Sequence, residues 1–403
     1  MKNSTKRILT LMICTILIFQ SITFCFSAQL ISDDTSNCSQ VAAYDNWDEY
    51  EEILQEKLCQ LSPNEYTALM QLLILTDDGK IRESEENLST IRNFYEDIDA
   101  QSKQINSSPS SVDNSANFPA PGNQGSQNSC VSWAVAYAAR SGIEATNKGW
   151  AVGSDNHNFS PSYIYNQLNS NNGSTSITST LAKVCSEGVC PLSYFPYNES
   201  DYSTQPTDIQ KAAAGLYKDT KWTLAMTMSD IKKQVQAGKA VVVMIKNYSD
   251  FKQLNNSTNQ IYDDITGTKY GNHAVAIVGY NDNMGANGAF KVLNSWGPSW
   301  GNNGYGWISY SVMTTSKALA NPFGYYFTGQ SSSTYTIGDI DNNGSISVDD
   351  ARLALRYSVQ SETPTALQYV LADANGNGSI SVENSREILR VATGLQTNCS
   401  VYD

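Results

Sequence analysis

The amino-acid sequence predicts an α+β protein, because helical and strand-like patterns occupy separate stretches of its central part. Between about Phe118 and Thr328, an apolar helical pattern at Ser129–Arg140 comes first. Strand-like apolar runs follow at Ala240–Ile245 and His273–Tyr280. Helices that precede strands, without βαβ alternation, are typical of an α+β domain. Near the C-terminus the string NGSISV occurs twice, which indicates a small duplicated unit.

The composition argues against one class of partner. The 403 residues are 40% hydrophobic, which is enough for a sizeable core, and they carry a net charge of −13. Binding of nucleic acid needs a basic surface, so this charge argues against a nucleic-acid partner. It is compatible with an exported protein or with one that binds divalent cations. The length predicts two or three domains.

The N-terminus has the pattern of a secretory signal. A basic start precedes an apolar run from Ile8 to about Phe26, and small residues at Cys25 and Ser27 suit a cleavage site. We therefore expect residues 1–28 to be a signal peptide, and the mature protein to be extracellular and free of the membrane. The alternative is an uncleaved membrane anchor, because the run is roughly long enough to span a bilayer.

Residues 29–115 are predicted to form a helical, propeptide-like region. Apolar residues recur at helical spacing in Tyr44–Leu61, Glu65–Leu75 and Glu83–Ile105. A stretch rich in Ser, Asn, Pro and Gly follows, which is typical of an exposed linker. A helical unit and a protease-sensitive linker ahead of a catalytic motif predict a zymogen. The alternative is an ordinary helical domain with a role of its own.

The eight cysteines do not form the pattern of a disulfide scaffold. Cys14 and Cys25 would leave with the signal peptide, and the others are scattered. Cys185 and Cys190 are close enough in sequence to pair, but spacing alone does not decide whether they are bonded.

Cys130 is the candidate nucleophile. It directly precedes the apolar run VSWAVAYAAR, so it lies at the N-terminus of a predicted helix, where the helix dipole favours a thiolate. The alternative is a structural cysteine buried in the core. Gln124, a short way upstream, has an amide that can donate a hydrogen bond to a developing oxyanion, together with the backbone N–H of Cys130.

The chain has two histidines, His157 and His273, so few candidates exist for the base. His157 lies in a polar loop pattern. His273 opens the strand pattern HAVAIVGY, which makes it either a satisfied core residue or a functional one. Asn294 follows a short apolar strand, and its amide oxygen can accept a hydrogen bond from an imidazole, with Trp296 covering that bond from water. A turn asparagine is the alternative.

The order Gln124, Cys130, His273 and Asn294 resembles that of the papain-like cysteine peptidases, peptidase family C1. The matching motifs are QG before the nucleophile, GNHAVAIVGY around His273, and NSWGPSWGNNGYGWI around Asn294. His273 follows Cys130 by about 140 residues, which is within the range of the family. The resemblance covers about Phe118–Thr328 and implies a two-lobed domain with a helical lobe and a β-sheet lobe.

The same resemblance implies an activity and a substrate cleft. The activity is peptide-bond hydrolysis by the Cys130 thiolate, as in thiol proteases of the EC 3.4.22 type, with no cofactor for catalysis. The candidate substrate-binding residues are Gly173, Ser174 and Trp296. Two departures mark a divergent branch: Gln127 stands where the family has a disulfide-forming cysteine, and Val131 stands where it has tryptophan.

Each copy of the C-terminal repeat has oxygen-bearing side chains at the spacing of an EF-hand calcium loop, with glycine at the sharp turn. The candidate ligands of the first loop are Asp339, Asp341, Asn343, Ser345 and Asp350. Those of the second loop are Asp373, Asn375, Asn377, Ser379 and Asn384. Because Asn384 offers a neutral amide where Asp350 offers a carboxylate, we expect two Ca²⁺ sites, the second of them weaker. The alternative is a turn that is merely rich in Gly and Asn.

A helix-like run follows each loop, from Ala351 and from Ser385, with little sign of a helix before either loop. Two such units over about 60 residues resemble a type I dockerin, a small α-helical module that binds the cohesin modules of scaffoldins in cellulosome-type complexes. The resemblance places the dockerin at 337–398, after a linker at 329–336. It implies cohesin contacts at Val348, Asp349, Leu355, Arg356, Val382, Glu383, Leu389 and Arg390.

Together these features predict a secreted cysteine endopeptidase, with its peptidase domain at 116–328, tethered by a dockerin to a cohesin-bearing, cellulosome-type scaffold. One alternative is a catalytically silent papain-like module that binds or inhibits on the same scaffold. Another is a related cysteine hydrolase that acts on cell-wall peptide.

Overall fold

The computed structural model describes residues 109–402, apart from 170, 220, 226–227, 256–259, 264, 314–323 and 329–332. The chain divides into two units, residues 1–108 and 109–403. The predicted signal peptide and nearly all of the predicted propeptide-like region lie outside the described residues. No helix in the described part has the length and apolar character needed to cross a membrane.

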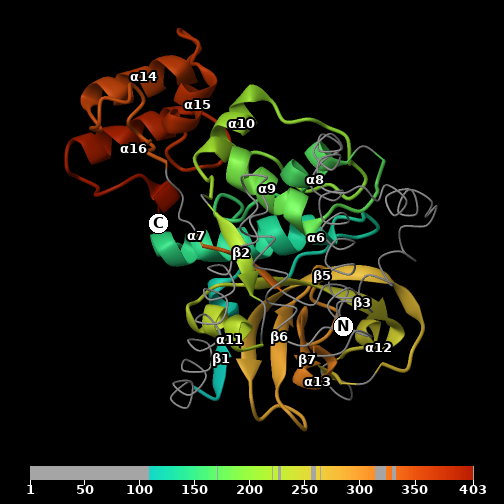
Figure 1. Ribbon diagram of the computed structural model, residues 1–403. Coiled ribbons are helices and arrows are strands. Elements are labelled where there is room, and N and C mark those ends of the chain that lie inside the picture. Colours follow the sequence, from blue (N-terminus) through green and yellow to red (C-terminus); the bar gives the residue numbers. More distant parts are fainter. Residues whose placement is uncertain are drawn as a thin grey trace, which may run out of the picture. The chain divides into compact units, whose positions relative to one another are not determined.

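One long helical stretch lies at the centre of the domain (Figure 1). It begins as α6 (Cys130–Ser132), continues as a π-helical segment (Trp133–Arg140) and ends as α7 (Ser141–Lys148). We call Cys130–Lys148 the central helix. All eight residues of the π-helical segment are buried, because this alanine-rich, apolar sequence has no polar face to turn to water. The predicted buried helix at Ser129–Arg140 is thus confirmed.

Three further helices complete the helical part of the domain, the first two packed on the central helix and the third packed on the second. They are α8 (Pro161–Leu168), α9 (Ile177–Glu187) and α10 (Asp208–Gly215). Helix α8 starts where it does because the Ser160 side chain accepts a hydrogen bond from the Tyr163 backbone N–H and proline occupies the first turn.

The other part of the domain is a twisted sheet with the strand order β2-β8-β3-β5-β6-β7-β4, to which β1 adds by pairing with β5. The pairs are antiparallel except for β4 with β7. The strands are β1 (Ser111–Asp113), β2 (Trp222–Ala225), β3 (Val241–Tyr248), β4 (Ile261–Tyr262), β5 (Lys269–Asn281), β6 (Ala289–Leu293), β7 (Tyr305–Ser309) and β8 (Gly324–Phe327). The strands predicted within β3 and β5 are confirmed.

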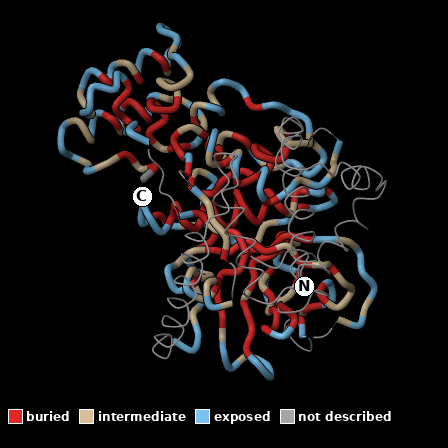
Figure 2. Tube along the Cα trace, in the orientation of Figure 1, coloured by how far each residue is buried: buried red, intermediate tan, exposed pale blue. Residues whose placement is uncertain are grey.

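Strand β5 is the long central strand, and its two faces belong to two different hydrophobic clusters. Ala274, Ala276 and Val278 pack with the helical part, whereas Val275 and Ile277 pack in a second cluster on the opposite face. This alternation follows from the two-residue period of a strand. Because both faces are covered, β5 is an almost continuous buried run, and Figure 2 shows the buried residues concentrated along the sheet and the central helix.

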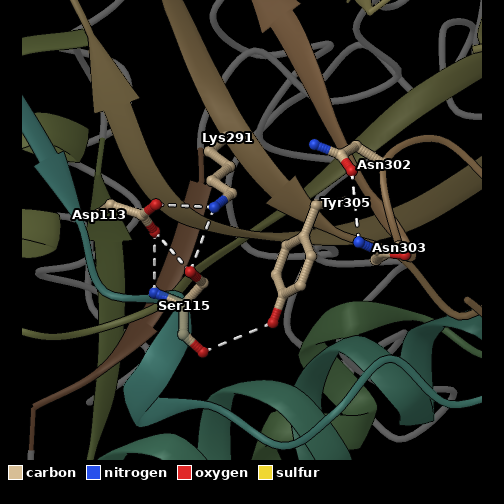
Figure 3. A network of polar contacts seen from close by, with 6 residues as sticks. All are labelled: Asp113, Ser115, Lys291, Asn302, Asn303 and Tyr305. Carbon is tan, nitrogen blue, oxygen red and sulfur yellow. Dashed lines mark hydrogen bonds and ion pairs between the residues drawn. The ribbon is translucent and has the colours of Figure 1, made fainter. Parts of the chain in front are cut away.

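The sheet begins earlier in the sequence than predicted. Strand β1 pairs with the end of β5, and the Asp113 carboxylate accepts a 2.7 Å hydrogen bond from the Lys291 ammonium. Figure 3 shows Lys291 between Asp113 and Ser115, with the Tyr305 ring beside it. Residues 109–115, which the sequence assigned to the propeptide-like region, therefore belong to the same compact unit as the sheet.

The C-terminal module consists of α14 (Val348–Ser358), α15 (Ala366–Ala372) and α16 (Val382–Ala392). Helices α14 and α16 follow the two predicted calcium loops, as expected, and pack against each other. Helix α15 lies before the second loop, where the sequence shows little sign of a helix. It is short, but a capping box between Thr365 and Gln368 fixes its start directly before the second loop.

A substitution tests whether the segment around β1 is part of the folded domain. Lys291→Met in the full chain removes the ion pair to Asp113, so we expect the free energy of unfolding to fall by about 1 kcal/mol, a modest loss because Asp113 is half exposed. Lys183→Met is the matched control, since Lys183 is equally buried but pairs only along its own helix with Glu187. Its loss should stay below about 0.5 kcal/mol. If guanidinium denaturation gives equal losses for the two variants, the ion pair to β1 does not stabilise the folded domain.

Candidate active site

Cys130 is the first residue of the central helix, and Ser129 is its N-cap. Ser129 is fully buried, and its hydroxyl lies 3.1 Å from the Tyr197 hydroxyl instead of capping a backbone N–H of the helix. The Cys130 sulfur lies at the backbone N–H groups of Val131 and Ala274, so the thiol sits directly beside the residue that follows His273. Burial raises the pKa of the Cys130 thiol, and these backbone donors act in the opposite direction.

His273 lies at the point where β5 enters the core, and it is buried. Its Nε2 atom lies 2.7 Å from the Asn294 Oδ1 atom. Since an amide oxygen can only accept, Nε2 carries the hydrogen, and Nδ1 is left as the basic nitrogen of the neutral ring. The Asn294 oxygen also accepts a 2.8 Å hydrogen bond from the Ser295 backbone N–H, which holds the amide in this orientation.

Trp296 shields this hydrogen bond. Its ring stacks on the His273 imidazole with centroids 4.4 Å apart, and Phe251 packs edge-on against Trp296. Burial under these rings lowers the pKa of His273 to about 4, while the Asn294 hydrogen bond raises it and the nearby Lys252 ammonium lowers it. Trp296 is thus placed as a cover for the imidazole, and its predicted contact with substrate stays a prediction.

Burial disfavours the charged form of the thiol and of the imidazole when each is charged alone. A proton transfer from Cys130 to His273 would create both charges together, and their attraction would offset part of the cost of desolvation.

Gln124 is buried and held by three contacts. Its Nε2 donates to the Gln127 carbonyl oxygen at 2.7 Å, its Oε1 accepts from the Ser295 hydroxyl at 2.8 Å, and its backbone N–H donates to the Ser295 carbonyl at 2.8 Å. An amide NH₂ has two hydrogens, so one remains for a ligand. Ser295 joins Gln124 to Asn294, and sequence reasoning missed this role although Ser295 lies within the NSWG motif.

Gln127 stands at the position where the papain-like resemblance would place a disulfide-forming cysteine. It is fully buried, its Nε2 donates to the Asp201 carbonyl at 3.0 Å, and its Oε1 accepts from the Tyr197 hydroxyl at 3.1 Å. The described cysteines, Cys185 and Cys190 among them, are all free thiols. Hydrogen bonds rather than a disulfide therefore fix the loop before the nucleophile.

The predicted substrate-binding residues Gly173 and Ser174 lie on a loop that is tied to the nucleophile loop. Asn128 donates from its backbone N–H to Asn172 Oδ1 at 3.0 Å, and from its side chain to the Asn172 carbonyl at 2.7 Å. The backbone N–H and carbonyl of Gly173 are both engaged with the Asn169 side chain. Ser174 is exposed. Substrate pairing at this loop stays a prediction.

The first predicted calcium loop brings three carboxylates together. Ligand atoms of Asp339, Asp341 and Asp350 lie within 4.8 Å of one another, and Gly344 has the positive φ of +92° that the sharp turn requires. Carboxylate oxygens gathered in this way suit a hard cation such as Ca²⁺. The other predicted ligands of this loop, Asn343 and Ser345, are exposed, and the Asn343 amide donates to Asp341 Oδ2 at 2.9 Å.

The second loop has the same backbone turn but a single carboxylate at its centre. Gly378 has a φ of +85°. The Asn384 amide nitrogen donates to Asp373 Oδ1 at 3.2 Å, so the amide that replaces Asp350 faces the aspartate with its nitrogen rather than its oxygen. Within this loop Asn375 accepts from the Asn377 backbone, and Asn377 accepts from Ser379.

The predicted cohesin-binding residues lie on the outer surface of α14 and α16. The apolar members Val348, Leu355, Val382 and Leu389 are each 40–54% exposed. The charged members are also exposed and form local ion pairs, Asp349 with Arg352, Arg356 with Glu362 and Glu383 with Arg386; Arg390 is exposed as well. The two helices thus present similar mixed surfaces.

A comparison with protein families decides the identity of the domain. The model of the papain family cysteine proteases matches residues 108–322, more than half of the chain. The chain belongs to the papain family of cysteine proteases. The matched range begins just before β1, in agreement with the early start of the sheet.

Curated relatives of this papain-family chain match over limited stretches. Peptidase 1 of Euroglyphus maynei is 28% identical over 31% of this chain and 38% of its own length. Cathepsin B-like CP3 of Giardia intestinalis is 31% identical over 27% of this chain and 38% of its own length. The chain thus spans about two fifths of these relatives. Among solved structures, xylellain, a cysteine protease from Xylella fastidiosa, is 25% identical with a TM-score of 0.47, covering 56% of this chain and 88% of that one.

The lowered pKa of His273 predicts a pH-dependent stability in a variant that lacks the thiol. In Cys130→Ala, His273 should stay neutral until the pH falls to about 4, whereas in the unfolded chain it gains its proton near pH 6.5. Stability is therefore lost as the pH falls from about 6.5 to 4, by about 3 kcal/mol.

Guanidinium denaturation at several pH values measures this loss, and the double variant Cys130→Ala/His273→Gln serves as the control. Only the difference between the two pH profiles belongs to His273, because other groups titrate alike in both. Parallel profiles would contradict the burial of a neutral imidazole.

Proposed function

We propose that this chain is a secreted cysteine endopeptidase that hydrolyses peptide bonds with Cys130, and that its C-terminal module is a type I dockerin that binds a cohesin. The observation that carries the peptidase assignment is the buried contact from His273 to Asn294, with the Cys130 thiol at the adjacent Ala274 backbone N–H. A nucleophile, a base and a group that orients the base are the parts that covalent acyl transfer needs.

The reaction starts with the transfer of the Cys130 proton to His273 Nδ1. The thiolate attacks the carbonyl carbon of the peptide bond and forms a tetrahedral oxyanion. The Cys130 backbone N–H at the helix N-terminus and the second hydrogen of the Gln124 amide donate to this oxyanion. His273 then gives its proton to the leaving amine, and the C–N bond breaks to leave a thioester on Cys130.

The second half of the reaction releases the acyl group. A water molecule gives a proton to His273 and attacks the thioester carbonyl. The C–S bond breaks, and the thiol of Cys130 regains its proton from His273. Throughout both halves Asn294 keeps the ring in one orientation, since a ring flip would break the hydrogen bond at Nε2.

A second candidate function is a catalytically silent papain-like module, and the burial of the Cys130 thiol favours it, because burial raises the pKa of that thiol. The ordered amides argue for the enzyme instead. Asn294 is buried with its oxygen at the His273 imidazole, and Gln124 is buried and held by Ser295 and Gln127 with one amide hydrogen left for a ligand.

In the C-terminal module we propose Ca²⁺ in both loops, with the first site the stronger. Asp339, Asp341 and Asp350 give the first site three negative ligands, while the second has Asp373 alone. The exposed apolar residues on α14 and α16 fit a cohesin of a cellulosome-type scaffold. We also propose that residues 1–28 direct export of the protein and that the propeptide-like region inhibits the peptidase domain.

The peptidase assignment predicts covalent labelling of one residue. An epoxide inhibitor of cysteine proteases should add one molecule to the full chain at Cys130, because the His273 imidazole makes this thiol nucleophilic. Mass spectrometry of tryptic peptides locates the label, and cleavage of casein reports activity. His273→Gln should lose both labelling and cleavage by roughly a hundredfold or more. Labelling at Cys185 instead, or casein cleavage by Cys130→Ala, would rule the mechanism out.

The calcium proposal predicts that the last ligand of each loop, Asp350 or Asn384, sets the Ca²⁺ affinity of its site. Isothermal calorimetry of the full chain should show one tight and one weak Ca²⁺ site. Asp350→Asn should weaken the tight site, and Asn384→Asp should strengthen the weak one, each by roughly tenfold or more, because a charged ligand is removed or added. Two equal sites in the unaltered chain contradict the proposal.

A further inference from the structure

The duplication allows the two loops to be compared position by position. In the first loop both oxygens of Asp339 accept hydrogen bonds from backbone N–H groups of that loop, at Asn343 and Gly344. The second loop keeps the equivalent bond from the Gly378 N–H to Asp373 Oδ2 at 2.7 Å, and the Asn377 backbone N–H also lies at the Asp373 carboxylate. Asp373 has two further contacts that come from side chains.

Asp373 contacts a residue from the peptidase domain. The Tyr194 hydroxyl donates to Asp373 Oδ2 at 2.7 Å, while the Asn384 amide donates to Oδ1. Asp373 is completely buried. A buried carboxylate needs hydrogen bonds to offset desolvation, and a charge-assisted bond from a hydroxyl is among the stronger ones. The second loop thus obtains one of its stabilising contacts from outside the module.

The backbone of the second loop also fits closely against the peptidase domain. A Cβ atom on Gly378 would lie 2.7 Å from the Ser193 carbonyl oxygen, which is closer than such atoms approach. Gly344, at the same position of the first loop, has nothing within 4 Å of its own Cβ position. Both glycines have the positive φ that the turn needs. Gly378 is needed, in addition, for the close approach to Ser193.

Two neighbouring contacts extend the same surface. The Asn156 side chain donates to the Asn375 carbonyl at 3.3 Å. The chain after α16 returns to this place, where the Val401 carbonyl oxygen lies 2.9 Å from Nε2 of the buried His157. Helix α15, directly before the loop, packs on α10 of the peptidase domain. The His157 ring, which is not part of the catalytic pair, is therefore used at this contact.

We propose that the second loop is a docking surface for the peptidase domain of the same chain, closed by the hydrogen bond from Tyr194 to Asp373. The docked module has one orientation relative to the peptidase domain. Within the part of the chain that the structure describes, the first loop and the exposed surface of α14 make no hydrogen bond to the peptidase domain. They therefore stay available to a partner. This proposal does not depend on peptidase activity or on cohesin binding.

Matched substitutions in the full chain test the docking surface. Asparagine tolerates a positive φ, so Gly378→Asn and Gly344→Asn should both keep their turns. Only the side chain at 378 would collide with Ser193. Tyr194→Phe removes the hydrogen bond to Asp373 from the other domain and leaves both loops unaltered. All variants carry Cys130→Ala, to prevent self-cleavage, and are measured in saturating Ca²⁺.

Two measurements report docking, namely the radius of gyration from small-angle X-ray scattering and hydrogen exchange at the Gly378 amide. Gly378→Asn and Tyr194→Phe should increase the radius of gyration. Tyr194→Phe should also speed exchange at Gly378 by roughly tenfold, the effect of losing about one charge-assisted hydrogen bond. Gly344→Asn should change neither quantity.

The outcomes separate docking from turn strain. If Gly344→Asn expands the chain as much as Gly378→Asn, strain in the turns explains the result and the proposal is wrong. If Tyr194→Phe matches the Cys130→Ala parent in both measurements, the hydrogen bond does not hold the domains together and the proposal is equally overturned. Casein cleavage is not used as a readout, so failure here leaves the peptidase assignment untouched.

Discussion

The hydrogen bond between His273 and Asn294 is the interaction on which the active site depends. It fixes which imidazole nitrogen carries a hydrogen, and so leaves Nδ1 as the base. Its geometry requires β5 to carry His273 into the core and β6 to end just before Asn294. The stacked Trp296 ring excludes water from it. The two hydrophobic clusters on either side of β5 keep these strands in place.

Burial of this site makes a charge on either Cys130 or His273 costly. Desolvation opposes a lone thiolate and a lone imidazolium, so neither residue holds a charge well without the other. The helix N-terminus at Cys130 and the backbone N–H of Ala274 favour the negative partner. In the proposed mechanism the oxyanion meets the Gln124 amide, which Ser295 and Gln127 already hold, so little reorganisation is needed in the transition state.

The sequence singled out Cys130, His273, Asn294 and Gln124 from their order and flanking motifs and from the presence of only two histidines. The structure brings His273 to Asn294, while the catalytic roles stay predictions. The contacts of Ser295 and Tyr197 could not be predicted, because hydroxyl groups are common and their partners are distant in sequence. Strand β1 was missed since its Ser- and Asn-rich surroundings have the composition of a linker, and only pairing with β5 makes it a strand.

The pH dependence of Cys130 alkylation tests the central claim, that His273 and Cys130 charge as a pair. An isolated thiol becomes reactive only near its ordinary pKa of about 9. We predict that iodoacetamide alkylates Cys130 rapidly at pH values well below this in the unaltered chain, and that His273→Gln removes this reactivity. Alkylation that rises only above about pH 8.5, with the same profile in both proteins, would contradict the account.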